Sequence, residues 1–224
     1  MENQKHVVII YPHPDDESFG AAGSIYHFRK QGIPVTYLCG TLGEMGRNMG
    51  TPQFANRETL PKIREKELAE ACKFLDIDYR LLGYRDKTIE FENKAKVAAH
   101  VKKVLEEINP TLVITHYPNH GVHPDHNALG EATIEAVRLM DEEERPTVWA
   151  AAITPEFERV LGEPDIVIPV EEQFDFKLEA ILKHKSQAEG MLKKLQDMPD
   201  EMKIYLEGLK ARLGKERFFT WKFD

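Results

Sequence analysis

The segment His6-Val-Val-Ile-Ile-Tyr-Pro-His-Pro-Asp-Asp-Glu17 passes from a continuous apolar run into a cluster of ionisable side chains. A short apolar run ended by proline is typical of a strand that is buried on both faces of a parallel sheet. The residues that follow, 17–31, have a helical pattern that ends at Gly32. Because a strand leading directly into a helix is the first half of a βαβ unit, this segment indicates an α/β fold.

The same alternation of strand and helix patterns continues along the chain. We expect further strands at residues 33–41, 79–82, 111–117, 148–154 and 166–170, and helices at 59–75, 97–108 and 126–140. This order predicts a Rossmann-like, mostly parallel sheet with helices on both faces. An apolar stripe predicts a mainly helical C-terminal extension over about residues 171–224, within a single domain of residues 1–224. The stripe consists of Leu178, Ile181, Leu182, Ala188, Leu192 and Leu195.

Composition excludes several classes of protein. The 224 residues include 38 acidic and 30 basic side chains, for a net charge of -8, which argues against nucleic-acid binding through phosphate neutralisation. No apolar run approaches the ~20 residues that span a bilayer. The two cysteines, Cys39 and Cys72, fall in separate predicted elements and imply no disulfide framework. We therefore expect a cytoplasmic protein with neither a nucleic-acid nor a membrane partner.

Two polar clusters follow predicted strands. His13-Pro-Asp-Asp-Glu17 comes after the first strand, and His123-Pro-Asp-His126 comes after the fourth. In open α/β sheets, ligands bind beyond the carboxyl ends of the strands. A helix start explains one or two of the acids, and a polar surface loop could explain the second cluster. Three consecutive carboxylates nevertheless repel one another, which indicates a positive group nearby.

A metal ion would supply that charge. One imidazole and one carboxylate from the first cluster, with one imidazole from the second, leave a coordination position for water, as in catalytic zinc sites. His13 and Asp16 can share one ion, and Asp15 between them is free to act as a general base. His123 and Asp125 would supply a second imidazole and its orienting carboxylate.

Two other kinds of metal site fit the same residue types. The set matches the two-His, one-carboxylate arrangement of non-haem iron oxygenases, although a free carboxylate beside the ligands favours hydrolysis. A structural or regulatory metal site without catalysis is the other alternative. The segment Gly20-Ala-Ala-Gly23 is only weakly similar to a dinucleotide-binding loop, because the preceding turn lacks the glycine-rich fingerprint.

These residues resemble the LmbE-like family of zinc-dependent N-acetylglucosamine deacetylases, which is related to the GlcNAc-PI de-N-acetylases. The signatures of that family are a strand ending in HPDDE and a later HPDH, and both stand here unbroken. The resemblance extends over about residues 5–190 and includes segments at 42–44, 64–67, 83–86 and 184–187. Within the family, the loops GEMGR and GYRDKT and the helix IREKEL are most similar to those of deacetylases of bacillithiol biosynthesis.

The resemblance implies a role for each of ten residues. It makes His13, Asp16 and His126 the ligands of one Zn²⁺ per chain, with Fe²⁺ or Co²⁺ as alternatives. It makes Asp15 the general base. His123 would stabilise the oxyanion or protonate the leaving amine, and Asp125 would orient His123. The implied substrate-binding residues are Glu44, Arg64, Asp86 and His184. Arg64 could instead be a solvated ion-pair partner on a helix rich in Glu and Lys.

The resemblance also implies an activity. The expected reaction removes the N-acetyl group from an N-acetylglucosaminide, with N-acetylglucosaminyl malate of bacillithiol biosynthesis as the expected substrate. Cleavage of bacillithiol S-conjugates, or deacetylation of another GlcNAc-containing small molecule, is the alternative. Because relatives are often trimeric or hexameric, a homo-oligomer is expected. Some relatives have a Tyr two residues before HPDH, where this chain has Gly121; Tyr117, His120 or a C-terminal residue could take its place.

Overall fold

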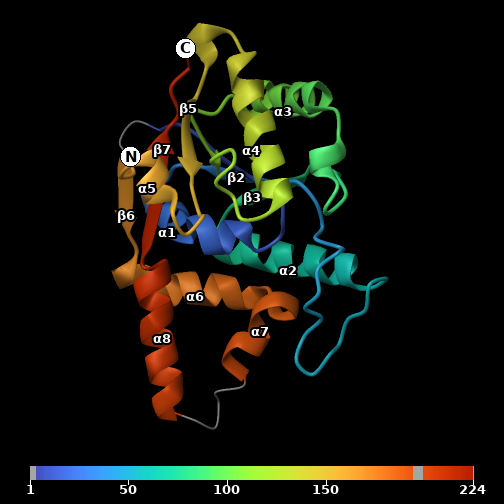
Figure 1. Ribbon diagram of the computed structural model, residues 1–224, viewed down its shortest axis with the longest axis vertical. Coiled ribbons are helices and arrows are strands. Elements are labelled where there is room, and N and C mark those ends of the chain that lie inside the picture. The colour runs from blue at the N-terminus through green and yellow to red at the C-terminus, as the bar shows by residue number, and fades with distance from the viewer. Residues whose placement is uncertain (1–3, 194–198, 224) are drawn as a thin grey trace.

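The computed structural model describes residues 4–193 and 199–223, whose strands form one seven-stranded sheet (Figure 1). The strand order is β3-β2-β1-β4-β5-β7-β6. The first five strands of that order pair in parallel, and β7 is antiparallel to both of its neighbours. The predicted mostly parallel sheet is therefore confirmed. The strands are β1 (Val7–Tyr11), β2 (Val35–Cys39), β3 (Asp78–Leu81), β4 (Leu112–His116), β5 (Thr147–Ala151), β6 (Ile166–Pro169) and β7 (Lys215–Thr220).

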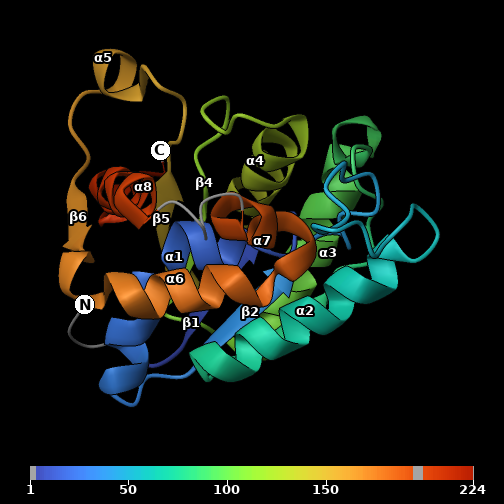
Figure 2. The ribbon, with the colours of Figure 1, turned by 90° about the horizontal axis from the view of Figure 1, so that it is seen from below.

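Helices cover both faces of the sheet (Figure 2). Strand β1 is buried throughout, so its side chains alternate between two apolar layers. Val7 and Ile9 pack in the layer of α1, α2 and α6, whereas Val8 and Ile10 pack in the layer of α3 and α4. The helices are α1 (Asp16–Lys30), α2 (Leu60–Leu75), α3 (Lys94–Ile108), α4 (Pro124–Arg138), α5 (Phe157–Leu161), α6 (Phe174–Lys183), α7 (Lys185–Lys193) and α8 (Pro199–Leu213). None of the described helices is long and apolar enough to cross a membrane.

The C-terminal segment differs in part from the predicted helical extension. Helices α6, α7 and α8 fit that prediction, but the chain then returns as β7 and lies between β5 and β6. Phe218 of β7 is buried and stacks on Trp149 of β5, with ring centroids 5.6 Å apart. Of the predicted apolar stripe, Leu195 lies outside the described residues, as does the side chain of Leu192.

The reversal of strand order at the centre of the sheet positions the two polar clusters. From β1 the chain continues to β2 on one side, and β4 pairs with β1 on the other side, with Ile10 opposite Thr115. The carboxyl ends of β1 and β4 are therefore neighbours. The turn into α1 and the loop into α4 start from these two ends, and a crevice between such loops is where open α/β sheets bind ligands.

A buried ion pair attaches the C-terminal segment to α1. The Glu216 carboxylate of β7 accepts hydrogen bonds from the backbone N–H groups of Gly23 and Ser24, at 2.9 and 2.7 Å. It also lies 2.6 Å from Nζ of Lys177 in α6, and both charged side chains are buried. Since α1 begins in the first polar cluster, this network holds the helix from which part of the site projects.

We predict that replacing Lys177 by Met destabilises the fold strongly. The substitution keeps an apolar stem but leaves the Glu216 carboxylate buried without its cation, which costs about 3–5 kcal/mol in the free energy of unfolding. Urea unfolding measures this change. The control is Lys183→Met, because Lys183 pairs with Glu179 at the surface, 3.0 Å away, and should change stability by less than about 1 kcal/mol. Equal effects of the two substitutions would contradict the assigned role of the buried pair.

Candidate metal centre and active site

Two imidazoles and one carboxylate converge at the carboxyl ends of β1 and β4. His13 and Asp16 come from the turn between β1 and α1, and His126 comes from the first turns of α4. His13 Nδ1 lies 3.3 Å from His126 Nε2 and 3.3 Å from an Asp16 oxygen. His126 Nε2 lies 3.4 Å from the other Asp16 oxygen. The structure thus brings the three predicted ligands together.

The spacing of the two nitrogens and the Asp16 oxygens fits a divalent metal ion. In a tetrahedral zinc site with bonds of 2.0–2.1 Å, neighbouring ligand atoms lie about 3.3–3.4 Å apart. The three observed separations have that size. Two imidazole nitrogens and one carboxylate are also the donor set of catalytic zinc sites, which leave a fourth position open. The residues present therefore fit one such ion.

A second group of carboxylates surrounds the other side of the His13 ring. His13 Nε2 lies 3.2 Å from Asp86 and 3.5 Å from Asp125. A histidine that binds metal through one nitrogen commonly donates its other N–H to a carboxylate, which fixes the ring and its tautomer. Burial lowers the pKa of His13, but contacts with Asp125, Asp16 and Asp86 raise it well above the ordinary value. The surroundings of this ring therefore favour positive charge.

His123 caps the N-terminus of α4 beside this group. Its Nδ1 accepts a hydrogen bond from the backbone N–H of Asp125 at 3.1 Å, so a neutral His123 carries its proton on Nε2. Burial lowers the pKa of His123, and the nearby His13 acts in the same direction. The prediction had the Asp125 carboxylate orient His123, but that carboxylate is 4.0 Å from Nδ1. It accepts instead from the backbone N–H groups of Lys87 and Ile89, at 2.6 and 3.1 Å.

Asp15, the predicted base, has a strained backbone. Its φ of 112° is rare for a residue with a side chain, and such conformations persist only where their surroundings hold them. The Asp15 N–H donates to Glu17 Oε2 at 3.0 Å, and Glu17 Oε1 lies 2.6 Å from His184 Nε2. Burial raises the pKa of Asp15 to about 6, against the opposing effect of the Arg64 guanidinium 3.1 Å away. A base whose pKa lies near the working pH suits proton transfer.

The four predicted substrate-binding residues divide into two pairs. Arg64 and Asp86 line a cavity of about 260 Å³ together with Asp15 and His123. Arg64 is buried, so it is not the solvated ion-pair partner that its helix also allowed. Glu44 contacts Asp86: its carboxylate accepts a hydrogen bond from the backbone N–H of Asp86 at 3.0 Å. His184 has no exposed surface and contacts Glu17, so its placement corrects the expectation of direct substrate contact.

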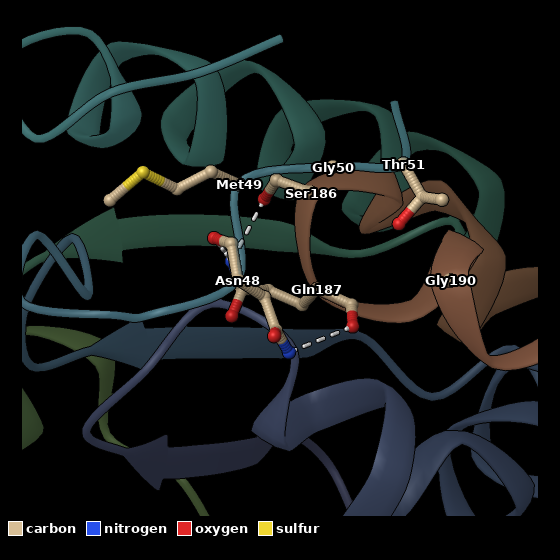
Figure 3. Close-up of a pocket in the computed structure, with 7 residues that line it drawn as sticks. All are labelled: Asn48, Met49, Gly50, Thr51, Ser186, Gln187 and Gly190. Carbon is tan, nitrogen blue, oxygen red and sulfur yellow. Dashed lines mark hydrogen bonds between the residues drawn. The ribbon is translucent and has the colours of Figure 1, made fainter. Parts of the chain in front are cut away.

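Sequence reasoning missed several residues at this site. Glu17, which holds the backbone of Asp15, stands in HPDDE itself, and Gln187 stands in the segment at 184–187. Besides His13 and the four residues already named, the side chains that line the 260 Å³ cavity are those of Met45, Arg47, Lys87 and Gln187. Gln187 also lines an adjoining cavity of about 280 Å³, where its side chain and that of Asn48 each bond to the other's backbone carbonyl (Figure 3).

The close packing of Gly121 on His126, a predicted metal ligand, explains why this position has no side chain. A Cβ at Gly121 would lie 2.5 Å from Cβ of His126, which is too close for any real contact. Tyr117 packs against Trp221, and Nδ1 of His120 lies 3.1 Å from Oγ1 of Thr154. Neither Tyr117 nor His120 is among the residues that line the 260 Å³ cavity, whereas Gln187 of the C-terminal segment does line it. The imidazoles that line it are those of His13 and His123.

Comparisons with known proteins identify the family of the chain. Residues 8–137 match the model of the family described as PIG-L, GlcNAc-PI de-N-acetylase. The chain is 50% identical, over 99% of its length and 100% of the relative's, to a Bacillus cereus protein named probable N-acetyl-alpha-D-glucosaminyl L-malate deacetylase 2. A Bacillus subtilis protein of the same name is 53% identical over 87% of this chain and 88% of its own.

A solved structure has the same fold. The N,N'-diacetylchitobiose deacetylase of Pyrococcus horikoshii, crystallised with its inhibitor MPG, superimposes with a TM-score of 0.75. The match covers 98% of this chain and 85% of the other, at 23% sequence identity. At that identity the likeness supports the fold alone.

We predict that Gly121→Ala weakens metal binding. The added methyl group must displace His126, and disturbing the support of a ligand lowers metal affinity by about 10–100-fold. Competition with a chromophoric chelator measures the dissociation constant. The control is Gly208→Ala in α8, where a Cβ meets nothing within 4 Å. Unchanged affinity in Gly121→Ala would show that His126 is not a ligand or that its position is not critical.

Proposed function

Because the chain belongs to the GlcNAc-PI de-N-acetylase family, and is a hydrolytic deacetylase, we propose that it is zinc-dependent and acts on N-acetyl-α-D-glucosaminyl L-malate in bacillithiol biosynthesis. The names of the relatives at 50% and 53% identity support this substrate. The observation that carries the catalytic part is the convergence of His13, Asp16 and His126 beside an uncoordinated Asp15. We also propose, from the resemblance, a cytoplasmic trimer or hexamer.

In this proposal His13, Asp16 and His126 hold the metal ion. When bound, such an ion polarises a carbonyl oxygen and lowers the pKa of its water to about 7. Asp15 accepts a proton from the attacking water, whose oxygen forms a bond to the acetamide carbon. Arg64 orients the Asp15 carboxylate from 3.1 Å away. The strained backbone of Asp15 keeps that carboxylate next to the ligands without making it one.

His123 acts on the amide oxygen in this scheme. Because its Nδ1 is occupied by the Asp125 N–H, its Nε2–H is available to donate a hydrogen bond as negative charge develops on that oxygen. One well-placed donor of this kind contributes about 3–4 kcal/mol to transition-state stabilisation. Asp15 then returns its proton to the departing nitrogen as the C–N bond breaks. The products are acetate and a free amine.

We predict that Asp15→Asn retains the metal but loses turnover. Asparagine tolerates positive φ and has the shape of aspartate, but it cannot accept the proton. The loss of a general base lowers kcat by about 10²–10⁴-fold. Metal analysis and steady-state kinetics on the same preparation measure both effects. Parent turnover by metal-replete Asp15→Asn would remove Asp15 from the base role, and normal metal stoichiometry in His126→Ala would remove His126 from the ligand set.

Metal removal and a pair of substrates test the reaction. A chelator should abolish release of free amine from N-acetylglucosaminyl malate, and zinc should restore it more fully than Fe²⁺ or Co²⁺. A bacillithiol S-conjugate, assayed in parallel, should be cleaved with a lower kcat/KM. Full activity after chelation would contradict metal dependence, and a higher kcat/KM on the S-conjugate would contradict the biosynthetic role.

A further inference from the structure

Two positively charged side chains of the 260 Å³ cavity form no ion pair within the described residues. Arg47 and Lys87 line this cavity, are exposed, and have no ion-pair partner among the described residues. Arg64, the other Arg or Lys of the lining, is engaged by Asp15. In a chain with a net charge of -8, unpaired cations beside the carboxylates of Asp15 and Asp86 form a local site for an anion.

The backbones of both cations are tied to the framework of the metal centre. Lys87 has a φ of 62°, a left-handed conformation, and its N–H donates to the Asp125 carboxylate at 2.6 Å. That same carboxylate lies 3.5 Å from the metal-facing His13. Arg47 follows a segment in which the Met45 N–H donates to Asp86 at 2.8 Å. Lys87 is therefore held by its own backbone, and Arg47 lies two residues after a backbone group that is held in the same way.

The chemistry of the substrate, as proposed above, requires such charges close to the reacting amide. In an N-acetylglucosaminide the acetamide is attached to C2 and the aglycone to C1, which are neighbouring carbon atoms. The malate group therefore lies in or at the cavity that holds Asp15. It carries two carboxylates, and like charges brought close together in a partly buried site repel strongly. Cations at the same cavity offset that repulsion.

We propose that Arg47 and Lys87 bind the carboxylates of the aglycone and so determine the preference of the enzyme for anionic α-N-acetylglucosaminides. This inference rests on the proposed function. Guanidinium and ammonium groups form charge-assisted hydrogen bonds with carboxylates, and Arg can do so with two parallel bonds. These two residues act on binding and not on the bond that is cleaved.

Another basic cavity provides a competing location. It has a volume of about 450 Å³, and its lining includes Arg212, Lys215 and Arg217 at the junction of α8 and β7. Neither Asp15 nor His123 lines it. Since the aglycone is adjacent to the acetamide, the cavity shared with Asp15 is the better location for the malate group.

The test compares two α-N-acetylglucosaminides that differ only in the charge of the aglycone, the L-malate glycoside and the methyl glycoside. The zinc-loaded parent should have the higher kcat/KM on the malate glycoside. Arg47→Gln and Lys87→Asn should each lower the ratio of the two kcat/KM values about tenfold, mainly through KM on the malate glycoside. Asparagine is chosen because it tolerates the left-handed backbone at position 87. Added salt should lower the parent's ratio.

The control is Arg85→Gln, which removes a charge from the same loop at a residue that does not line the cavity and should leave the ratio unchanged. Metal content and thermal unfolding of each variant verify that it is folded. A parent that does not prefer the malate glycoside would contradict the proposed substrate and, with it, this inference. A parent preference that survives in Arg47→Gln and Lys87→Asn would overturn the inference alone. Loss of preference in Arg212→Gln or Lys215→Gln instead would assign the aglycone to the other cavity and would also overturn it.

Discussion

Two imidazoles that are 113 residues apart in the chain approach within 3.3 Å, with a carboxylate in contact with both. The strand order of the sheet makes this contact possible, because it places the carboxyl ends of β1 and β4 side by side. Burying so many ionisable groups at one point is unfavourable unless opposite charges compensate. Under the proposed function, a bound divalent ion would compensate them and would also supply the chemistry of amide hydrolysis.

The surrounding groups turn the ligand cluster into a catalytic arrangement. Asp125 serves three purposes at once, since its carboxylate contacts His13 and holds the backbone of Lys87 while its N–H fixes the ring of His123. Glu17 performs a similar task for Asp15, and it is itself held by the buried His184 of the C-terminal segment. The C-terminal segment thus supports the site through His184 and contributes Gln187 to the lining of its cavity.

The sequence predicted local features better than features that depend on tertiary pairing. An apolar run followed by HPDDE identified β1 and the start of α1, because these depend on neighbouring residues. Strand β7 was missed, because a six-residue strand after a helix is specified mainly by its partners β5 and β6. For the same reason the sequence did not show that the Asp125 carboxylate accepts from the backbone of Lys87 and Ile89, or that the side chain of His184 contacts Glu17. The sequence pattern shows which residues are polar but not which atoms their side chains contact in the folded chain. Gly121 likewise marks a close approach to His126 that only the folded chain shows.

The central claim is that His13, Asp16 and His126 hold one metal ion and Asp15 does not. The most direct measurement is a crystal structure of the zinc-loaded protein, with anomalous differences collected on both sides of the zinc absorption edge. We predict one zinc peak about 2.0–2.1 Å from His13 Nδ1, His126 Nε2 and an Asp16 oxygen, with the Asp15 carboxylate outside bonding distance. A peak ligated by Asp15, or by the group of Asp86, His123 and Asp125 instead, would contradict the account.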